Sequence, residues 1–392
     1  NASYSDPRQR QLFKNIIYVG ALSQLLGVDE SVFEKLFSEQ YKGKELLLQS
    51  NMKALRMGRD WMKENHTSTF GLKVKAADRV GERIFTDGNS AAALGCVYGG
   101  ATVAAWYPIT PSSSVAEAFQ KYCEKFRVED DSGRHRYAIV QAEDELASIG
   151  IVVGAGWNGA RAFTTTSGPG ISLMTEFIGL AYFAEIPVTI INVQRGGPST
   201  GMPTRTQQGD LFSLAYASHG DTKHIVLFPS NPEDAFYLSV TAFDLADRFQ
   251  TPVFVATDLD IGMNDWMVPE FTWNDAYTPD RGKVLTREQI EALPKFHRYL
   301  DSDGDGIPYR TLPGTSSKGA YFTRGSGHNK LGGYTEDSAE YREVVDRLVA
   351  KFQTAKTLVP SALLTGDGHQ SVGLLSYGSS DEAVKESLDQ LK

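Results

Sequence analysis

Apolar residues near the start of the chain recur at helical spacing. In residues 8–27, RQRQLFKNIIYVGALSQLLG, they lie three and four positions apart, and the pattern stops at Gly27. A second stretch of this kind, SVFEKLFSEQY at residues 31–41, follows an acidic segment that can cap the start of a helix. We therefore predict two or three helices within residues 1–65, and a polar linker over residues 66–88.

Between residues 89 and 265 the pattern changes to short apolar runs that alternate with helical stretches. This alternation is typical of a parallel sheet covered by helices on both faces, so the predicted fold class is α/β with a doubly wound parallel sheet. In such sheets, ligands bind at the edge where the strands have their carboxyl ends. The predicted strands are ATVAAWYPI (101–109), RAFTTTS (161–167), PVTIINVQ (187–194), KHIVLFP (223–229) and PVFVATD (252–258).

After residue 265 the periodicity weakens. Residues 266–370 are rich in Gly, Pro and Asp, which predicts a long irregular segment. Residues 371–392 predict a strand, a Gly-Ser turn and an amphipathic helix, the start of a further α/β domain. Because one βα unit cannot bury both faces of a sheet, we expect that domain to be incomplete. Because the sequence does not begin with Met, we expect the domain formed by residues 1–65 to be incomplete as well.

Composition narrows the classes of function. The 392 residues are 41% hydrophobic and 22% charged, as in ordinary globular proteins, and the net charge of −9 disfavours a general nucleic-acid binder. The sequence has neither an apolar run long enough for a membrane span nor an export signal, so we expect a cytoplasmic protein. Two cysteines, Cys96 and Cys123, cannot supply a four-thiolate cluster. Their spacing leaves a disulfide open, although so few cysteines fit a reducing compartment better.

The segment WYPITPSSS, residues 106–114, places hydroxyl groups between a predicted strand and a helix. Two prolines fix the backbone around Thr110, and the free N–H groups at the helix start favour an anion, so a carboxylate could dock here. The alternative is a rigid loop whose serines only cap the helix.

Three consecutive acids, Glu143, Asp144 and Glu145, precede a helix rich in small residues. Their side chains cannot all share one face of a helix, and Glu145 is the one that we expect to be buried. Burial disfavours the charged form of a carboxyl, so Glu145 could donate a proton at neutral pH. All three acids could instead complement the helix dipole at an exposed N-terminus.

Two further strand ends carry glycines. TTTSGPG, residues 164–170, could cradle a phosphate with its backbone N–H groups, but it lacks the signatures of a P-loop and of dinucleotide binders. The alternative is that Gly168 and Gly170 only permit a tight turn with positive φ. NVQRGGPSTGMPT, residues 192–204, places Arg195 at the same edge as Thr110, where a guanidinium can bind a carboxylate with two hydrogen bonds. A structural ion pair is the alternative for Arg195.

One further segment imitates a metal site. Asp301, Asp303 and Asp305 resemble the start of a calcium loop, but Leu312 stands where the loop needs its Glu. We expect an acidic turn or a weak cation site, and we assign no metal ligand.

In this order, YPITPSS, QAEDELA, TTTSGPGISLMTE and NVQRGGPSTGMPT resemble the α subunit of the 2-oxoacid:ferredoxin oxidoreductases. The resemblance covers about residues 85–265 as a pyrimidine-binding domain for thiamine diphosphate. Residues 1–65 resemble the end of the γ-type domain that some members carry ahead of it. DGDGIPYRTLPG and FTRGSGHN are similar to the 2-oxoglutarate branch of the family.

This resemblance implies an activity and a set of site residues. The activity is oxidative decarboxylation of 2-oxoglutarate with coenzyme A to succinyl-CoA, with electrons passed to ferredoxin. A β subunit would share the thiamine diphosphate and carry Mg²⁺ and a [4Fe–4S] cluster, in an (αβ)₂ heterotetramer. The implied residues are Glu145 at the aminopyrimidine, Tyr107, Pro108 and Ile109 lining its pocket, and Thr110, Arg195 and Thr200 at the 2-oxoacid.

Other functions stay open at this stage. Pyruvate or a branched-chain 2-oxoacid could be the substrate. The chain could also be a non-catalytic scaffold for a β-type subunit, or a free-standing nucleotide-binding module.

Overall fold

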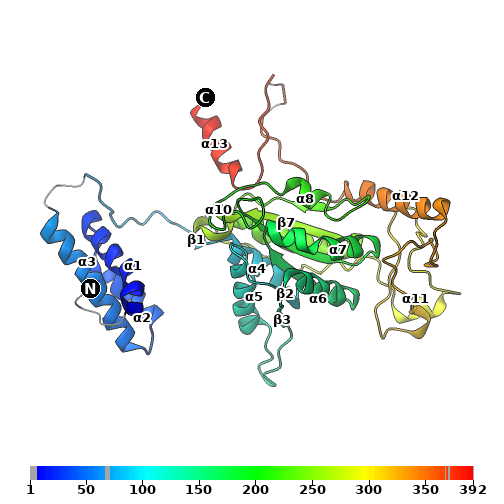
Figure 1. Cartoon of the computed structure of the whole chain (residues 1–392), viewed down its shortest axis with the longest axis horizontal. Coiled ribbons are helices and arrows are strands. Elements are labelled where there is room, and N and C mark those ends of the chain that lie inside the picture. The colour runs from blue at the N-terminus through cyan, green and yellow to red at the C-terminus, as the bar shows by residue number, and fades with distance from the viewer. Residues whose placement is uncertain (1–6, 67–70, 367, 370, 392) are drawn as a thin grey trace. The chain divides into compact units, whose positions relative to one another are not determined.

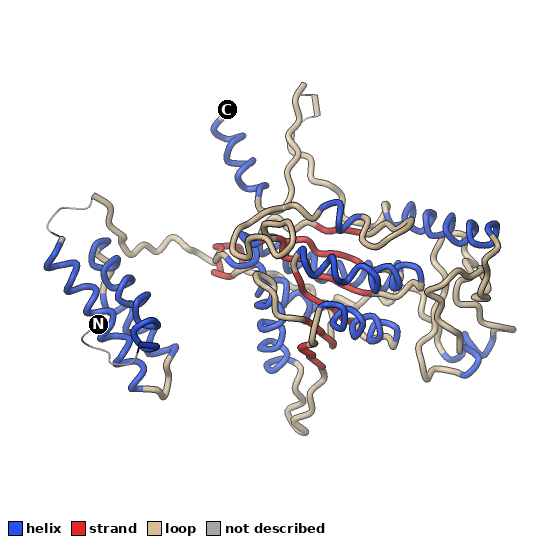
Figure 2. Tube along the Cα trace, viewed as in Figure 1, coloured by secondary structure: helices blue, strands red, loops and turns tan. Residues whose placement is uncertain are grey.

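The computed structural model of the chain describes residues 7–66, 71–366, 368–369 and 371–391. The chain divides into two compact units, residues 1–81 and 82–392. The described part of the first unit consists of helices and connecting segments, whereas the second contains a six-stranded sheet (Figure 2).

The helices predicted near the start of the chain are confirmed. They are α1 (Pro7–Leu26), α2 (Glu30–Gln40) and α3 (Glu45–Asn65). The chain leaves α1 through Gly27, whose φ of +74° is a left-handed conformation that glycine adopts without strain. Asp29 then caps α2 by accepting a hydrogen bond from the backbone N–H of Ser31 at 2.8 Å.

Two glycines let α1 and α3 approach each other closely. A Cβ atom at Gly20 would lie 2.0 Å from the carbonyl oxygen of Leu55, and one at Gly58 would lie 1.9 Å from that of Ile17. Each helix therefore needs glycine at the crossing, because any side chain there would meet the other helix's backbone.

The second unit is organised around a parallel sheet with the strand order β3-β2-β4-β5-β7-β6 (Figure 1). The strands are β2 (Val103–Trp106), β3 (Ala138–Gln141), β4 (Ala162–Thr166), β5 (Val188–Gln194), β6 (Ile225–Leu227) and β7 (Pro252–Asp258). The five predicted strands are all present, whereas β3 is an additional strand at the edge of the sheet. The predicted α/β class is confirmed.

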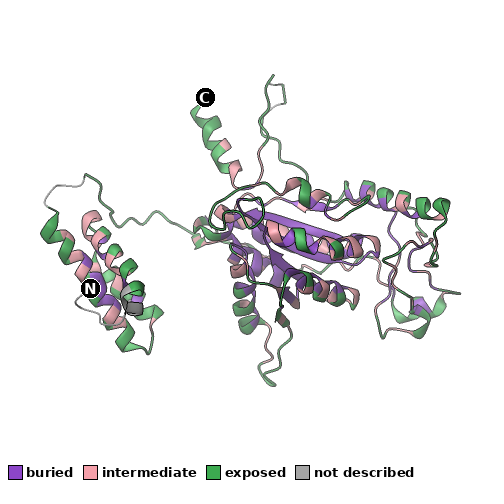
Figure 3. Cartoon of the chain, in the orientation of Figure 1, coloured by how far each residue is buried: buried purple, intermediate pink, exposed green. Residues whose placement is uncertain are grey.

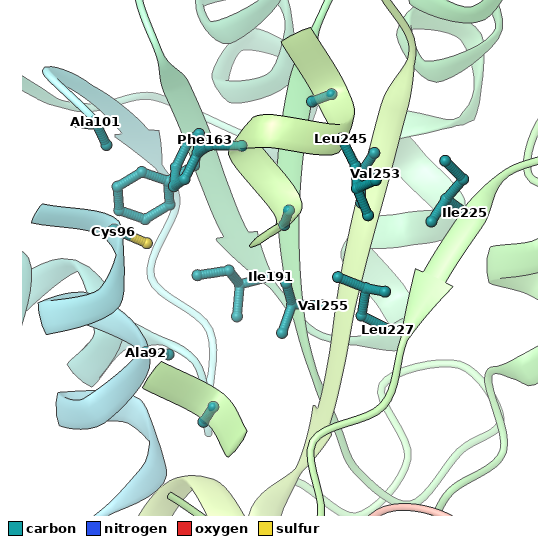
Figure 4. Packing of buried hydrophobic residues seen from close by; sticks show 14 of the residues in the cluster. Ala92, Cys96, Ala101, Phe163, Ile191, Ile225, Leu227, Leu245, Val253 and Val255 are labelled. Carbon is teal, nitrogen blue, oxygen red and sulfur yellow. The ribbon is translucent and has the colours of Figure 1, made fainter. Parts of the chain in front are cut away.

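Helices cover both faces of this sheet. One face packs against α4 (Gly88–Tyr98), α5 (Ser113–Phe126) and α9 (Pro232–Phe249), the other against α6 (Glu145–Trp157), α7 (Gly168–Phe183) and α8 (Leu211–Ala215). Within β5, Ile191 faces the first layer and Ile190 the second, and both are fully buried. Figure 3 shows the strands as a buried layer, and Figure 4 shows Ile191 packed with Val255 and Phe163.

Both cysteines lie in the first of these helix layers. Cys96 and Cys123 are free and buried, so they form no disulfide. Burial raises the pKa of both thiols, that of Cys123 to about 11, which keeps them protonated at neutral pH.

A second, two-stranded sheet was not predicted. It pairs β1 (Arg83–Thr86) antiparallel with β8 (Trp266–Pro269). The strand β1 lies within the predicted polar linker, and β8 lies at the start of the segment predicted to be irregular. Their pairing joins the segment just before α4 to the segment just after the short helix α10 (Leu259–Met263).

The prediction of an irregular segment over 266–370 is wrong in part. It contains α11 (Arg287–Ala292), a 3-10 turn (Ser317–Gly319) and the long helix α12 (Ser338–Ala355). Val344, Leu348 and Phe352 are buried at helical spacing on α12, a signal that the surrounding polar sequence obscured. The Arg347 and Lys351 side chains also contact Glu185 beyond the end of α7, at 2.5 Å and 3.0 Å.

The strand predicted near residue 372 is absent from the described residues. Val372, Leu374 and Leu375 are exposed, and no described strand lies beside them to supply backbone partners. The Gly-Ser turn and the helix that follow are confirmed, the helix as α13 (Ser380–Gln390).

Candidate active site

The residues singled out by sequence converge at the carboxyl edge of the large sheet. Glu145 follows β3, Thr110 follows β2, Gly170 follows β4 and Arg195 follows β5. These four strands are neighbours in the order β3-β2-β4-β5, so their carboxyl ends form one continuous part of the sheet edge, which we call the ledge.

Arg195 lies buried at the end of β5. Its Nη1 donates to the carbonyl oxygen of Thr110 at 2.6 Å, and its Nη2 donates to that of Thr200 at 2.7 Å. These two contacts confirm that Arg195 and Thr110 meet, and they fix the plane of the guanidinium. Thr110 itself is exposed at the sheet edge.

The charge of Arg195 has no counterion among the described residues. The guanidinium makes no ion pair with any of them, and Nε is buried without a hydrogen-bond partner among them. Burial lowers the pKa of Arg195, because the charged form loses water. The structural ion pair considered for Arg195 is therefore wrong, and an anionic ligand would satisfy a cation that the fold leaves uncompensated.

The serines after Thr110 are used by the loop itself. The hydroxyls of Ser112 and Ser113 donate to the carbonyl oxygen of Ile109 at 3.2 and 3.3 Å, and Ser114 accepts from Asn89 at 2.8 Å. Ser112 stands at the N-cap of α5, but its side chain makes no capping bond. These hydroxyls brace the backbone, and Tyr107, Pro108 and Thr110 remain exposed.

Glu145 begins α6 and is only 6% exposed, whereas Glu143 and Asp144 are exposed. Asp144 caps the helix by accepting from the N–H of Ala147 at 2.6 Å. The prediction that Glu145 alone is buried is confirmed. Its carboxyl makes no hydrogen bond to another described residue, so it can make one to a ligand atom.

The glycines after β4 work differently from the prediction. Neither Gly168 nor Gly170 has positive φ; both lie in the first turn of α7. A Cβ atom at Gly170 would lie 2.9 Å from Cγ of Glu145 and 1.9 Å from Oγ1 of Thr166. Glycine is therefore required because α7 starts directly against the Glu145 side chain.

Sequence reasoning missed Asn192, Gln194 and Asp210. Asn192 Nδ2 donates to the Asp210 carboxylate at 2.9 Å, and the N–H of Asp210 donates to Gln194 Oε1 at 3.0 Å. Burial raises the pKa of the Asp210 carboxyl, and the hydrogen bond from Asn192 opposes this. The available signal was two polar residues at alternate positions of an otherwise apolar strand.

These contacts anchor the loop of residues 196–210 at both ends. Alternate residues of β5 point to opposite faces of the sheet. Asn192 and Gln194 hold the far end of the loop beside α7, and Arg195 on the other face holds Thr200. The loop therefore reaches over the strand end in a defined position.

The acidic turn is occupied by a cation from the chain itself. Lys283 Nζ lies 2.7 Å from the Asp303 carboxylate and 2.8 Å from that of Asp305. Asp301 accepts hydrogen bonds from backbone N–H groups of Gly304 and Gly306. Of the two expectations, this fits the acidic turn. The described residues contain no group of three or more His, Cys, Asp or Glu that could hold a metal ion, and none of their helices is long and apolar enough to cross a membrane.

Comparisons with known proteins identify the family. Residues 94–274 match the family described as "Pyruvate flavodoxin/ferredoxin oxidoreductase, thiamine diP-bdg", and residues 5–61 match "Pyruvate ferredoxin/flavodoxin oxidoreductase". Over 316 residues the chain is 43% identical to the 2-oxoglutarate synthase subunit KorA of Methanocaldococcus jannaschii, covering 79% of this chain and 78% of that one. The chain belongs to the family of 2-oxoacid:ferredoxin oxidoreductase α subunits.

Longer members of this oxidoreductase family match nearly the whole chain. It is 35% identical over 395 residues to subunit alpha of 2-oxoacid:ferredoxin oxidoreductase 2 of Aeropyrum pernix, covering 96% of this chain and 59% of that one. The chain thus spans about three fifths of such relatives. A solved 2-oxoglutarate:ferredoxin oxidoreductase of Magnetococcus marinus, with 2-oxoglutarate, coenzyme A and succinyl-CoA bound, superposes with a TM-score of 0.79 at 29% identity, covering 98% of this chain and 65% of that one.

Proposed function

We propose that this chain is the α subunit of an enzyme that oxidatively decarboxylates 2-oxoglutarate with coenzyme A and passes the electrons to ferredoxin. The observation that carries the proposal is the buried guanidinium of Arg195, which has no counterion among the described residues, at the ledge that also holds Glu145. The relatives named 2-oxoglutarate synthase, and the ligands in the Magnetococcus structure, favour 2-oxoglutarate over other 2-oxoacids.

Glu145 fits the aminopyrimidine of thiamine diphosphate. Its buried carboxyl makes no hydrogen bond to another described residue, so it could hydrogen-bond a ring nitrogen. Tyr107, Pro108 and Ile109 would line the pocket of the ring. Bound thiamine diphosphate supplies the electron sink that makes loss of the carboxyl group feasible.

Arg195 and Thr110 would orient the carboxylate of the 2-oxoacid, with Thr200 beside them. The carbonyl oxygens of Thr110 and Thr200 hold the guanidinium in place before substrate arrives, which lowers the ordering cost of binding. Because this carboxylate leaves as carbon dioxide, the contact has to orient the substrate without binding it too tightly in the ground state.

The remaining cofactors are proposed for a β subunit. With two cysteines, both buried in the helix layer, this chain cannot ligate a four-thiolate cluster by itself. We therefore propose that Mg²⁺, the diphosphate site and a [4Fe–4S] cluster lie on the β subunit of a cytoplasmic (αβ)₂ heterotetramer. Residues 1–65 would be the end of a γ-type domain and residues 371–392 the start of a further domain.

The proposal is tested by assaying the chain, assembled with its β subunit, for viologen reduction dependent on coenzyme A. We expect 2-oxoglutarate to be used in preference to pyruvate and branched-chain 2-oxoacids. Arg195→Ala should raise the KM for 2-oxoglutarate about 10- to 100-fold, the effect of losing a charged hydrogen-bonding partner, and leave the KM for coenzyme A unchanged.

Arg205→Ala is the matched control, because Arg205 is an exposed arginine of the same loop whose side chain, among the described residues, hydrogen-bonds only Thr204. It should keep the KM of the unaltered enzyme. If Arg195→Ala impaired assembly and left the KM for 2-oxoglutarate unchanged, the chain would be a scaffold for the β subunit.

A further inference from the structure

A turn far along the chain touches the loop that holds Arg195. Residues 371–375 are exposed, but Gly378 is buried and its two neighbours are half-buried. The hydroxyl of Tyr377 donates to the carbonyl oxygen of Gln208 at 3.2 Å. The Tyr377 ring also packs edge-on against Phe228, with ring centres 5.1 Å apart.

Asp258 joins this turn to the loop. One oxygen of its carboxylate accepts from Nε2 of Gln208 at 2.8 Å and from the backbone N–H of Ser379 at 3.2 Å. The other oxygen caps α10 at the end of β7. Gln208 Nε2 also reaches the hydroxyl of Ser379 at 3.3 Å. A single carboxylate thus ties together the sheet edge, the loop and the turn.

The fit at this contact is close. Gly378 has a φ of +63°, and a Cβ atom there would lie 2.4 Å from Nε2 of Gln208. The Gln208 amide donates to the Asp258 carboxylate. A glutamate at position 208 could not donate this bond as a carboxylate and would place a second negative charge beside Asp258. The contact therefore depends both on glycine at position 378 and on the amide of Gln208.

We propose that residues 377–379 act as a clasp that holds the 196–210 loop closed over the sheet edge, and that Gln208 is a positioning residue for Arg195. The loop carries Thr200, whose carbonyl oxygen holds Nη2 of Arg195. Opening the clasp therefore loosens one of the two contacts that fix the guanidinium. The consequence for substrate rests on the proposed function, whereas the clasp itself does not.

The clasp is tested on the full chain by limited trypsin digestion, with the fragment ending at Arg205 quantified by mass spectrometry. Arg205 is exposed within the loop, so cleavage after it reports how often the loop opens. Gln208→Glu should speed this cleavage about fivefold or more, because two carboxylates then face each other, and Tyr377→Phe should speed it about twofold.

Controls separate the clasp from general unfolding. Ser387→Ala alters a hydroxyl in α13 that bonds only within that helix, and it should leave cleavage after Arg205 unchanged. Tyr377→Phe keeps the ring on Phe228, so it remains a test of the clasp even if Gln208→Glu fails to fold. Unchanged cleavage in Tyr377→Phe, together with unchanged cleavage in any folded Gln208→Glu protein, would overturn the clasp.

The consequence for substrate is measured on the assembled enzyme. Gln208→Glu should raise the KM for 2-oxoglutarate about fivefold and change kcat less than about twofold, because it disturbs the orientation of Arg195 and not the reacting groups. Faster cleavage with an unchanged KM would overturn the positioning role, provided that Arg195→Ala does raise the KM. If Arg195→Ala leaves the KM unchanged, the proposed function fails, and the digestion still decides the clasp.

Discussion

Replacing Glu145 by Gln should lower kcat for 2-oxoglutarate about 10²- to 10⁴-fold, the usual contribution of a positioned proton donor or acceptor. The side chain is buried at the start of α6 and lacks a hydrogen-bond partner among the described residues, so its carboxyl can contact a ligand atom. A glutamine keeps the size and a hydrogen bond but cannot exchange a proton with a ring nitrogen. The measurement is steady-state viologen reduction by the assembled enzyme.

The control for this variant is Glu143→Gln. Glu143 is exposed and lies two residues earlier in the same segment, so its replacement makes the same chemical change away from the ledge. It should retain kcat within about twofold. Gel filtration should show that both variants assemble. A Glu145→Gln enzyme with undiminished kcat would exclude Glu145 from the chemistry.

Replacing Glu185 by Gln should lower the free energy of unfolding of the second unit by about 3–5 kcal/mol, the usual cost of breaking a buried ion pair. Arg347 and Lys351 of α12 converge on this fully buried carboxylate, and Arg298 donates to its carbonyl oxygen at 2.6 Å. Without the carboxylate, two cations on α12 stay buried and uncompensated. Urea unfolding followed by circular dichroism measures the loss.

The matched control is Glu343→Gln, because Glu343 lies on the same helix α12 and makes an exposed ion pair with Lys330, which lies before that helix. It should change the free energy of unfolding by less than about 1 kcal/mol. An effect of Glu185→Gln as small as that of the control would show that the cluster does not hold α12.

The Glu185 cluster also predicts an acid dependence. Burial alone would raise the pKa of the Glu185 carboxyl, but Arg347 and Lys351 outweigh it and hold the pKa well below its usual range. The stabilisation by Glu185 is therefore full above the unfolded carboxyl's pKa and is lost as the pH falls toward the folded value. The difference between the unaltered chain and Glu185→Gln should accordingly shrink in acid.

Much of the sheet was predictable because each buried parallel strand is a short apolar run that ends in a turn. The burial of Glu145 and the meeting of Arg195 with Thr110 were predictable for a related reason. Strand ends of a parallel sheet share one edge, and the small residues of α6 permit close packing around one acid. Their roles toward substrate and cofactor remain proposals.

The rest depends on contacts between distant segments, which periodicity does not encode. The strand β3 is a four-residue edge strand whose side chains are mostly exposed, and α12 is secured by Glu185, which lies 162 positions from its main partner Arg347. The roles of Asp210 and Gln208 arise only when the loop folds back on β5 and β7. The glycines of α7 were assigned a turn because sequence does not reveal that Asp210 lies against Gly168, and Thr166 and Glu145 against Gly170.

The central claim is that the buried carboxyl of Glu145 meets the aminopyrimidine of thiamine diphosphate. A cryo-electron microscopy map of the chain assembled with its β subunit and thiamine diphosphate tests it directly. The account predicts a Glu145 carboxylate oxygen within about 2.6–3.2 Å of a ring nitrogen. Density for the cofactor away from this ledge, or a Glu145 carboxyl that points into solvent, would contradict it.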